Sequence, residues 1–128
     1  VDFNERCEIV DCDMDFDAID VDLSEEDPYR FMADRLLRNS MNGPRERRIE
    51  RALECARMLD ADGVVWYCHW GCKQSAGGAA YLKKAAAARN LPMLILDGDA
   101  IDRRNTQEGQ IKTRTEAFLE MLKNRRTL

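Results

Sequence analysis

The fold of this chain is decided by the stretch Val64-Val65-Trp66-Tyr67-Cys68-His69-Trp70-Gly71-Cys72-Lys73-Gln74-Ser75. It opens with a run of β-branched and aromatic residues, 64–67, which is typical of a strand covered on both faces. An alanine-rich helix is expected to follow over 76–89, with Ser75 as its cap and with Gly77 and Gly78 allowing close packing on a sheet. The stretch therefore predicts a strand, a turn and a helix.

A second apolar run, Met93-Leu94-Ile95-Leu96, follows that helix. Two apolar strands joined by a helix indicate a right-handed parallel crossover. The loops that leave the carboxyl ends of such strands lie at one edge of the sheet. We therefore predict a three-layer α/β fold with a short parallel sheet flanked by helices, and a site where the loops 68–74 and 97–105 meet.

Three further helices are expected from their start signals and apolar spacing. Asp27-Pro28 combines a favoured N-cap with proline at the first helical position, and Asn42-Gly43-Pro44 ends that helix. Thr106 can cap the last helix. The expected apolar positions are Phe31, Met32, Leu36 and Leu37 in the first helix, Ile49, Leu53, Ala56 and Leu59 in the helix 44–59, and Ile111, Thr115, Phe118, Leu119 and Leu122 in the last.

Residues 1–43 read as an acidic lead-in, with a short strand over Glu8-Ile9-Val10-Asp11 and an acidic loop over 13–27. Residues 44–128 read as the α/β lobe. At 128 residues the whole chain is expected to be one domain. Because it begins with Val1 and not with methionine, we expect processing or excision from a longer subunit.

The net charge of −4 is unevenly spread, with a balance of −10 over residues 1–32 and +6 over the remainder. This pattern indicates either ordinary solvated surfaces or a basic part that faces an anionic ligand such as a CoA phosphate. The bases are scattered among acids without an aromatic stripe, which argues against nucleic-acid binding. No run of 18 apolar residues and no leader appear, so we expect a cytoplasmic protein without a membrane span.

The chain has five cysteines, an odd number that fits a reducing compartment better than a disulfide scaffold. Only Cys68 and Cys72 are close, and the chain has a single histidine, His69. A zinc site usually needs four ligands in two closely spaced pairs. A self-contained zinc finger is therefore disfavoured.

Cys72 is the strongest candidate for chemistry. A helix amino terminus and the neighbouring Lys73 both favour thiolate, the form that binds iron or zinc or attacks an electrophile. His69 lies in the same turn and not opposite the thiol, which ranks Cys-His catalysis below ligation of a soft metal centre. The alternative is a small buried cysteine, and for Cys68, at the strand end, we favour packing.

Other polar and aromatic residues of the two loops have two interpretations each. Trp70 is either a core residue or a shield that keeps water from a cluster. Asp97 and Asp99 either cap their loop, which we favour, or bind a water-linked group. Arg103 and Arg104 either pair with acids on the surface, which we favour, or contact a ligand phosphate.

Six motifs follow one another in this part of the chain: His69-Trp70-Gly71-Cys72-Lys73-Gln74, Leu91-Pro92-Met93-Leu94-Ile95-Leu96-Asp97-Gly98-Asp99, Asp102-Arg103-Arg104-Asn105, Gly109-Gln110, Thr113-Arg114 and Glu116-Ala117-Phe118-Leu119-Glu120-Met121-Leu122. From about residue 44 to 122, in the same order and spacing, the chain resembles the carboxyl-terminal region of the 2-hydroxyacyl-CoA dehydratase subunits. That family includes 2-hydroxyglutaryl-CoA dehydratase and the benzoyl-CoA reductase-like and double-cubane cluster proteins.

The resemblance implies longer subunits, built from lobes with flavodoxin- or Rossmann-like parallel sheets, that hold a [4Fe-4S] cluster through three cysteines. The third of these corresponds to Cys72, with His69, Trp70, Gly71, Lys73 and Gln74 shaping its loop. It further implies a homologous second subunit and an ATP-hydrolysing iron–sulfur activator that delivers one electron. The substrate is a 2-hydroxyacyl-CoA, which loses water through a ketyl radical anion under anaerobic conditions. Asp97, Asp99, Arg103 and Arg114 are candidate ligand contacts.

Cys7, Cys12 and Cys55 do not match the family's two upstream cluster ligands, so the chain resembles a lobe that is inactive on its own. Two alternatives remain at this stage. One is a benzoyl-CoA reductase-like or double-cubane reductase from the same family. The other is a non-catalytic assembly module, which predicts that Cys72 is buried and inert.

Overall fold

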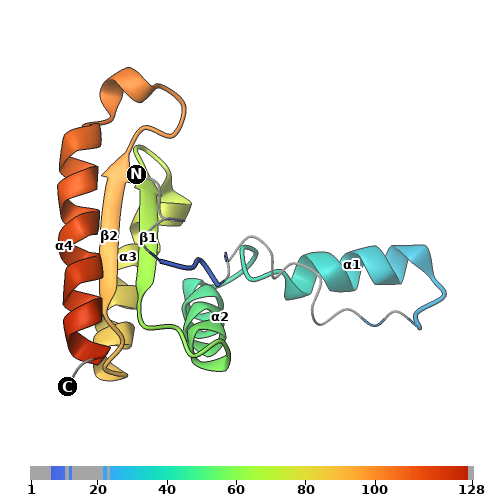
Figure 1. Ribbon diagram of the computed structural model, residues 1–128. Helices are drawn as coiled ribbons and strands as arrows, with labels where there is room; N and C mark the ends of the chain where they lie inside the picture. Colours follow the sequence, from blue (N-terminus) through green and yellow to red (C-terminus); the bar gives the residue numbers. More distant parts are fainter. Residues whose placement is uncertain (1–6, 11, 13–21, 23, 127–128) are drawn as a thin grey trace.

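The computed structural model describes residues 7–10, 12, 22 and 24–126, with Arg103 described by its backbone alone (Figure 1). The elements follow in the order α1 (Pro28–Arg38), α2 (Arg45–Met58), β1 (Val64–His69), α3 (Lys73–Ala88), β2 (Met93–Gly98), the 3-10 turn η3 (Arg103–Asn105) and α4 (Glu108–Arg126). Strands β1 and β2 pair in parallel, from Val64 opposite Met93 to His69 opposite Gly98. The predicted α/β fold, with helices flanking a short parallel sheet, is confirmed.

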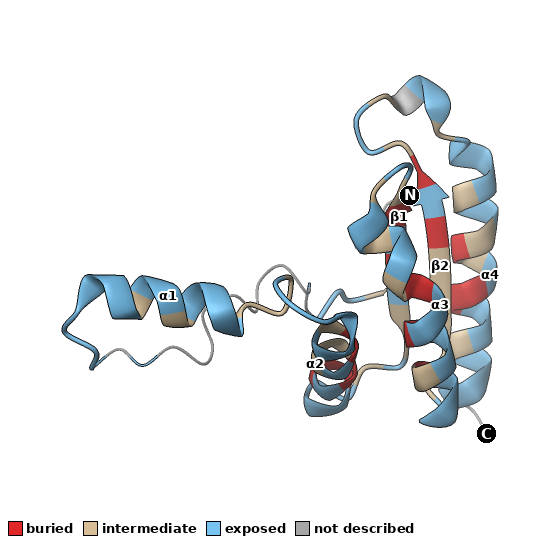
Figure 2. Cartoon of the chain, turned by 180° about the vertical axis from the view of Figure 1, so that it is seen from behind, coloured by how far each residue is buried: buried red, intermediate tan, exposed pale blue. Residues whose placement is uncertain are grey.

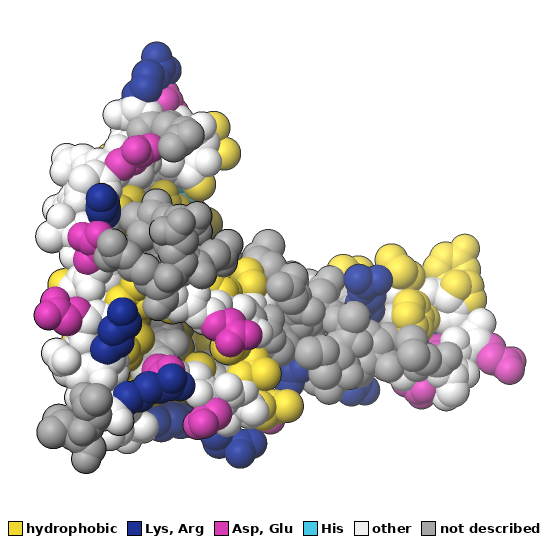
Figure 3. All heavy atoms as spheres, viewed as in Figure 1, with side chains coloured by type: hydrophobic (Ala, Val, Ile, Leu, Met, Phe, Trp, Pro, Cys, Tyr) yellow, Lys and Arg dark blue, Asp and Glu magenta, His cyan; other side chains and the backbone are white. Residues whose placement is uncertain are grey.

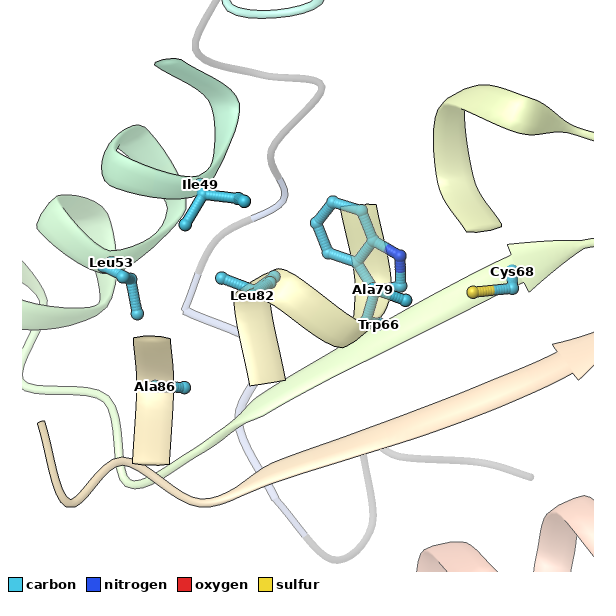
Figure 4. Packing of buried hydrophobic residues seen from close by; sticks show 7 residues of the cluster. All are labelled: Ile49, Leu53, Trp66, Cys68, Ala79, Leu82 and Ala86. Carbon is cyan, nitrogen blue, oxygen red and sulfur yellow. The ribbon is translucent and has the colours of Figure 1, made fainter. Parts of the chain in front are cut away.

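Helix α3 covers one face of the sheet, and α2 packs against α3, so that the two helices and the sheet form the main core (Figure 4). Trp66 and Cys68, which alternate along β1, point to this face. Leu82 of α3 lies at the centre of the cluster with 1% of its surface exposed. The buried members contributed by the two helices are Ile49, Leu53, Ala79, Leu82 and Ala86.

Helix α4 covers the other face, but only over β2. Leu96, Phe118 and Leu119 are buried there, and the fully buried Thr115 lies among the same turns of α4 (Figure 2). Val65 and Tyr67 of β1 belong to this face by strand alternation and are 42% and 39% exposed. The expectation that the first strand is covered on both faces is therefore wrong, because no described helix lies over that half of the sheet.

Helices α2 and α3 end in the same way. A residue in the left-handed conformation, Asp60 with φ 48° or Asn90 with φ 56°, follows each helix. The next N–H, of Ala61 or Leu91, donates back to a carbonyl five residues earlier at 2.9 Å in both cases. These Schellman-type ends turn the chain sharply into β1 and β2, as expected for polar residues with short side chains at such positions.

The structure corrects several local predictions in the α/β region. Helix α3 begins at Lys73 with Cys72 as its N-cap residue, so Ser75 lies in the first turn and does not cap the helix. Apart from the nearby backbone of α3 itself, no atom lies within 4 Å of a Cβ built on Gly77 or Gly78, so these glycines do not pack on the sheet. Leu59, expected on the buried face of α2, is 40% exposed because the helix has already ended at Met58.

Of the structural predictions for residues 1–43, only the helix is confirmed. The Asp27 carboxylate accepts the Tyr29 N–H at 2.9 Å, which caps α1 as predicted. Residues 8–10 are not in a strand, contrary to expectation, and most of the predicted acidic loop lies outside the described residues. None of the α1 residues is buried, and its hydrophobic side chains gather on a surface that extends away from the sheet (Figures 1 and 3).

None of the helices in the described part of the chain is sufficiently long and apolar to span a bilayer.

Candidate functional site

The loops that follow β1 and β2 meet at the carboxyl end of the sheet, as predicted. The Trp70 N–H donates to the Gly98 carbonyl at 3.0 Å, which extends the pairing beyond the strands. The Ala100 N–H donates to Nδ1 of His69 at 3.0 Å. Through Nδ1, the His69 side chain at the end of β1 therefore accepts a hydrogen bond from the second loop and joins the two loops.

Cys72 lies at this edge, at the amino terminus of the 16-residue helix α3, and is partly exposed. Gly71, with φ 75°, makes the left-handed turn before it, a conformation that favours glycine. The hydroxyl of Ser75, followed by its N–H, lowers the pKa of the Cys72 thiol, with smaller contributions from the Gln74 N–H and the charge of Arg48. The thiol makes no cap hydrogen bond of ordinary geometry, so these groups act by stabilising the thiolate once it forms.

Cys68 differs from Cys72 although only three residues separate them. It is buried, and its thiol donates to the Ser75 carbonyl at 3.5 Å. Burial, followed by the nearby charge of Asp97, raises the pKa of Cys68. Cys68 is therefore a neutral packing residue, in agreement with the expectation from sequence.

Ser75 connects both ends of this turn and was misassigned by sequence reasoning. Its hydroxyl accepts the His69 N–H at 3.2 Å and donates to the Cys72 carbonyl at 3.3 Å. Its carbonyl accepts the Trp66 indole N–H at 2.7 Å. The spacing Cys72-x-x-Ser75, which places Ser75 at the third helical position where side chains reach back to the N-cap, was the available signal.

Asp99 organises the second loop. Its carboxylate accepts the N–H groups of Ile101 at 2.9 Å and Asp102 at 3.1 Å and the side-chain amide of Asn105 at 2.9 Å. The Asn105 amide, followed by the Ile101 N–H, lowers the pKa of Asp99 to about 2. The favoured interpretation of Asp99 as a loop cap is confirmed.

Thr106 acts on the same loop and not as the expected cap of α4, which starts at Glu108. Its hydroxyl accepts the Asp99 N–H at 3.1 Å and donates to the Asp99 carbonyl at 2.9 Å. The side chain is consequently occupied in closing the turn after β2. Thr106 and Asp99 together fix the loop against which His69 packs.

Two of the candidate arginines, Arg114 and Arg104, are paired with acidic side chains. Arg114 forms an ion pair with Asp97 at 3.4 Å and donates a hydrogen bond to the Ile95 carbonyl. Arg104 pairs with Asp102 at 2.7 Å, the surface pairing that the sequence favoured. The side chain of Arg103 lies outside the described atoms. An anionic ligand at Arg114 would therefore compete with Asp97.

The other residues of the Cys72 loop point in different directions. Trp70 is 51% exposed and is not a core residue, and Lys73 is also exposed. The Gln74 amide donates to the Met41 carbonyl at 2.7 Å, which ties the start of α3 to the segment before α2. Arg48 lies 4.3 Å above the Trp66 ring and donates to the Gln74 carbonyl at 3.3 Å. Sequence reasoning missed Arg48, since its role depends on a contact between α2 and the sheet.

A complete metal site is not formed by the residues that the structure describes: no three His, Cys, Asp or Glu side chains among them are arranged to hold an ion. One accessible thiol with a lowered pKa can still serve as a single ligand of a shared centre. The donor set therefore fits one corner of an iron–sulfur cluster and does not fit a cluster held by this region alone.

Comparison with models of known families identifies the family of this chain. The family model described as 2-hydroxyglutaryl-CoA dehydratase, D-component, matches residues 3–122. The chain belongs to this family. The match includes the Cys72 turn and also extends to residues before 44, where the motifs were less distinctive. The family is a dehydratase component, so the chain is a component of a lyase that acts on acyl-CoA. No protein of curated function matches the chain.

Proposed function

We propose that the chain is the carboxyl-terminal lobe of a 2-hydroxyacyl-CoA dehydratase subunit and that Cys72 supplies one ligand to a [4Fe-4S] cluster in the parent subunit. The observation that carries the proposal is the partly exposed Cys72 at the start of α3, beside the loop that follows β2. The family match supports the enzyme class. The assembly-module alternative required a buried Cys72, and the thiol is not buried.

The electrostatics of the turn favour this role. Thiolate is the form that ligates iron, and the amino terminus of α3 and the donors of Ser75 stabilise it. When bound, the cluster supplies one-electron chemistry and an open iron for a substrate oxygen, as needed for radical elimination of water from a 2-hydroxyacyl-CoA. The exposed indole of Trp70 is available to exclude water beside it.

The remaining loop residues have supporting roles in this proposal. Gly71 permits the turn, His69 joins the two loops, and Gln74 fixes the start of α3. Lys73 adds positive charge next to the ligand, and Arg114 is a candidate contact for an anionic part of the acyl-CoA. The other ligands, the homologous second subunit and the ATP-dependent activator lie beyond this chain, so the isolated lobe is inactive and the assembled enzyme works in an anaerobic cytoplasm.

The test compares two cysteines of the same turn. The parent subunit is reconstituted anaerobically with iron and sulfide as wild type, Cys72→Ala and Cys68→Ala, and iron content and visible absorbance are measured. We expect Cys72→Ala to lose most of the cluster signal, whereas Cys68→Ala retains it because the buried Cys68 only packs. A cluster signal of wild-type intensity in Cys72→Ala would rule out the proposed ligand.

A further inference from the structure

The turn between β1 and α3 is closed by a backbone bond from the Cys72 N–H to the His69 carbonyl at 3.1 Å and, in addition, by the side chain of Ser75. Its hydroxyl accepts the His69 N–H at the end of β1 and donates to the Cys72 carbonyl at the start of α3. The first bond holds His69, which precedes the left-handed Gly71, and the second holds Cys72, which follows it. Besides the backbone bonds, Cys72 is therefore linked to the end of β1 by a group that can donate and accept at the same time, as a hydroxyl does.

The backbone of Ser75 is held independently of this hydroxyl. Its carbonyl accepts both the Trp66 indole N–H at 2.7 Å and the Cys68 thiol at 3.5 Å, and both donors belong to buried residues of β1. Removing the hydroxyl consequently leaves α3 anchored on the sheet, while the turn that carries Cys72 loses its two side-chain hydrogen bonds and keeps its backbone bonds. This separation allows the role of the side chain to be tested without loss of the fold.

We propose that Ser75 is a positioning residue for Cys72: it fixes the 69–72 turn so that the Cys72 sulfur meets the cluster in one orientation, next to the donors of the first turn of α3. The inference rests on the proposed function, because it takes Cys72 as the ligand. Hydrogen-bond donors around a ligating sulfur stabilise the reduced, more negative cluster and so raise its reduction potential. Ser75 thus helps to set the potential at which the parent enzyme accepts an electron.

The first experiment measures the cluster of the reconstituted parent subunit in wild type, Ser75→Ala and Ser75→Thr. We expect Ser75→Ala to retain its iron, since Cys72 is still present. Its one-electron reduction equilibrium should shift about tenfold toward the oxidised form, which is about 59 mV. The electron paramagnetic resonance spectrum of its reduced cluster should change with it. Ser75→Thr, which keeps a hydroxyl, should restore both readouts.

The second experiment needs no cluster. In the 128-residue chain, amide hydrogen exchange of His69 should accelerate about tenfold in Ser75→Ala, because the N–H loses its acceptor, and return toward the wild-type rate in Ser75→Thr. Ser24→Ala is the matched control, since among the described residues that hydroxyl donates to the Asp22 carboxylate ahead of α1, far from the turn that carries Cys72. We expect it to leave both the exchange of His69 and the reduction potential unchanged.

The outcomes separate this inference from the proposed function. If Cys72→Ala keeps the cluster, the proposed function is wrong. If Cys72→Ala loses the cluster but Ser75→Ala has the wild-type potential and spectrum, the function stands and Ser75 has only a structural role, which overturns the inference. Should Ser75→Ala not fold, the matched pair Ser75→Thr and Ser75→Val tests the hydroxyl at nearly constant shape, and equal potentials in the two would overturn it.

Discussion

Helices α1 and α3 were both predicted from the sequence, but they differ in how far their residues are buried. Both carry apolar residues at helical spacing, but α3 buries Ala79, Leu82 and Ala86 whereas α1 buries none of its residues. The difference is that α3 packs on a sheet and on α2, while the residues of α1 are exposed or half-buried (Figure 2). An amphipathic pattern thus determines that a helix forms with an apolar face, and the availability of a second surface determines whether that face contributes to stability.

The largest expected effect comes from removing equivalent leucines in the two helices. Leu82→Ala should lower the free energy of unfolding by about 3 kcal/mol, because Leu82 is 1% exposed and its loss leaves a cavity in the core. Leu36→Ala in α1 should cost less than about 0.5 kcal/mol, since Leu36 is 57% exposed. Urea unfolding followed by circular dichroism measures both. Equal losses would mean that α1 is packed in solution.

A second comparison uses two glycines of the α/β body, which consists of α2, β1, α3, β2 and α4. A Cβ on Gly63 would lie 2.9 Å from Phe118 Cζ and 3.2 Å from the Pro92 carbonyl, so Gly63→Ala should destabilise by about 2 kcal/mol. Gly77→Ala meets no atom within 4 Å and replaces a helical glycine, so it should stabilise by about 0.5–1 kcal/mol. Opposite signs in thermal unfolding are expected. A stabilising Gly63→Ala would show that α4 is not seated on the sheet as the structure has it.

The loop held by Asp99 should make the stability of the body depend on pH. The pKa of Asp99 is lowered from 3.8 to about 2, chiefly by the Asn105 amide, so the folded state favours the carboxylate. Its contribution is complete above pH 3.8 and is lost as the pH falls toward about 2. Asp99→Asn should flatten the stability profile in that window, as measured by urea unfolding at several pH values. An unchanged slope would show that the carboxylate does not hold the loop.

The smallest expected effect on the body comes from the cap of α1. Asp27→Ala removes the acceptor of the Tyr29 N–H and should cost the local helix about 1 kcal/mol. Because α1 is not packed on the sheet, the unfolding midpoint of the body should stay the same while helical circular dichroism decreases slightly. A lower midpoint would indicate that α1 and the body unfold together.

Much of the site could be predicted because its signals are local. The apolar runs of β1 and β2 and the position of Cys72 between a strand and a helix placed the thiol at the correct edge of the sheet. The interpretation of Asp99 as a loop cap also rested on neighbouring backbone groups, which a short side chain reaches without help from the rest of the fold. The start of α3 was misjudged by three residues because Ser75 is a favoured cap and Cys72 is not.

The contacts that were missed join segments distant in sequence. His69 accepts the Ala100 N–H, Arg48 lies on the Trp66 ring, and Arg114 pairs with Asp97. Each contact requires either the register that sets His69 opposite Gly98 or the packing of α2 against α3 and of α4 against β2. Residue types alone do not specify these distances, since many arginines and aspartates in the chain have equivalent local surroundings.

The sequence by itself determined the order of helices and strands, the parallel pairing and the exposed edge where Cys72 lies, because these follow from short-range backbone preferences and from the periodicity of apolar residues. Only the tertiary structure decided that β1 is covered on one face, that the apolar side of α1 has no described partner, and that Ser75 reaches back to His69. The physical reason is that burial and cross-loop hydrogen bonds depend on how surfaces meet, which is a property of the whole chain.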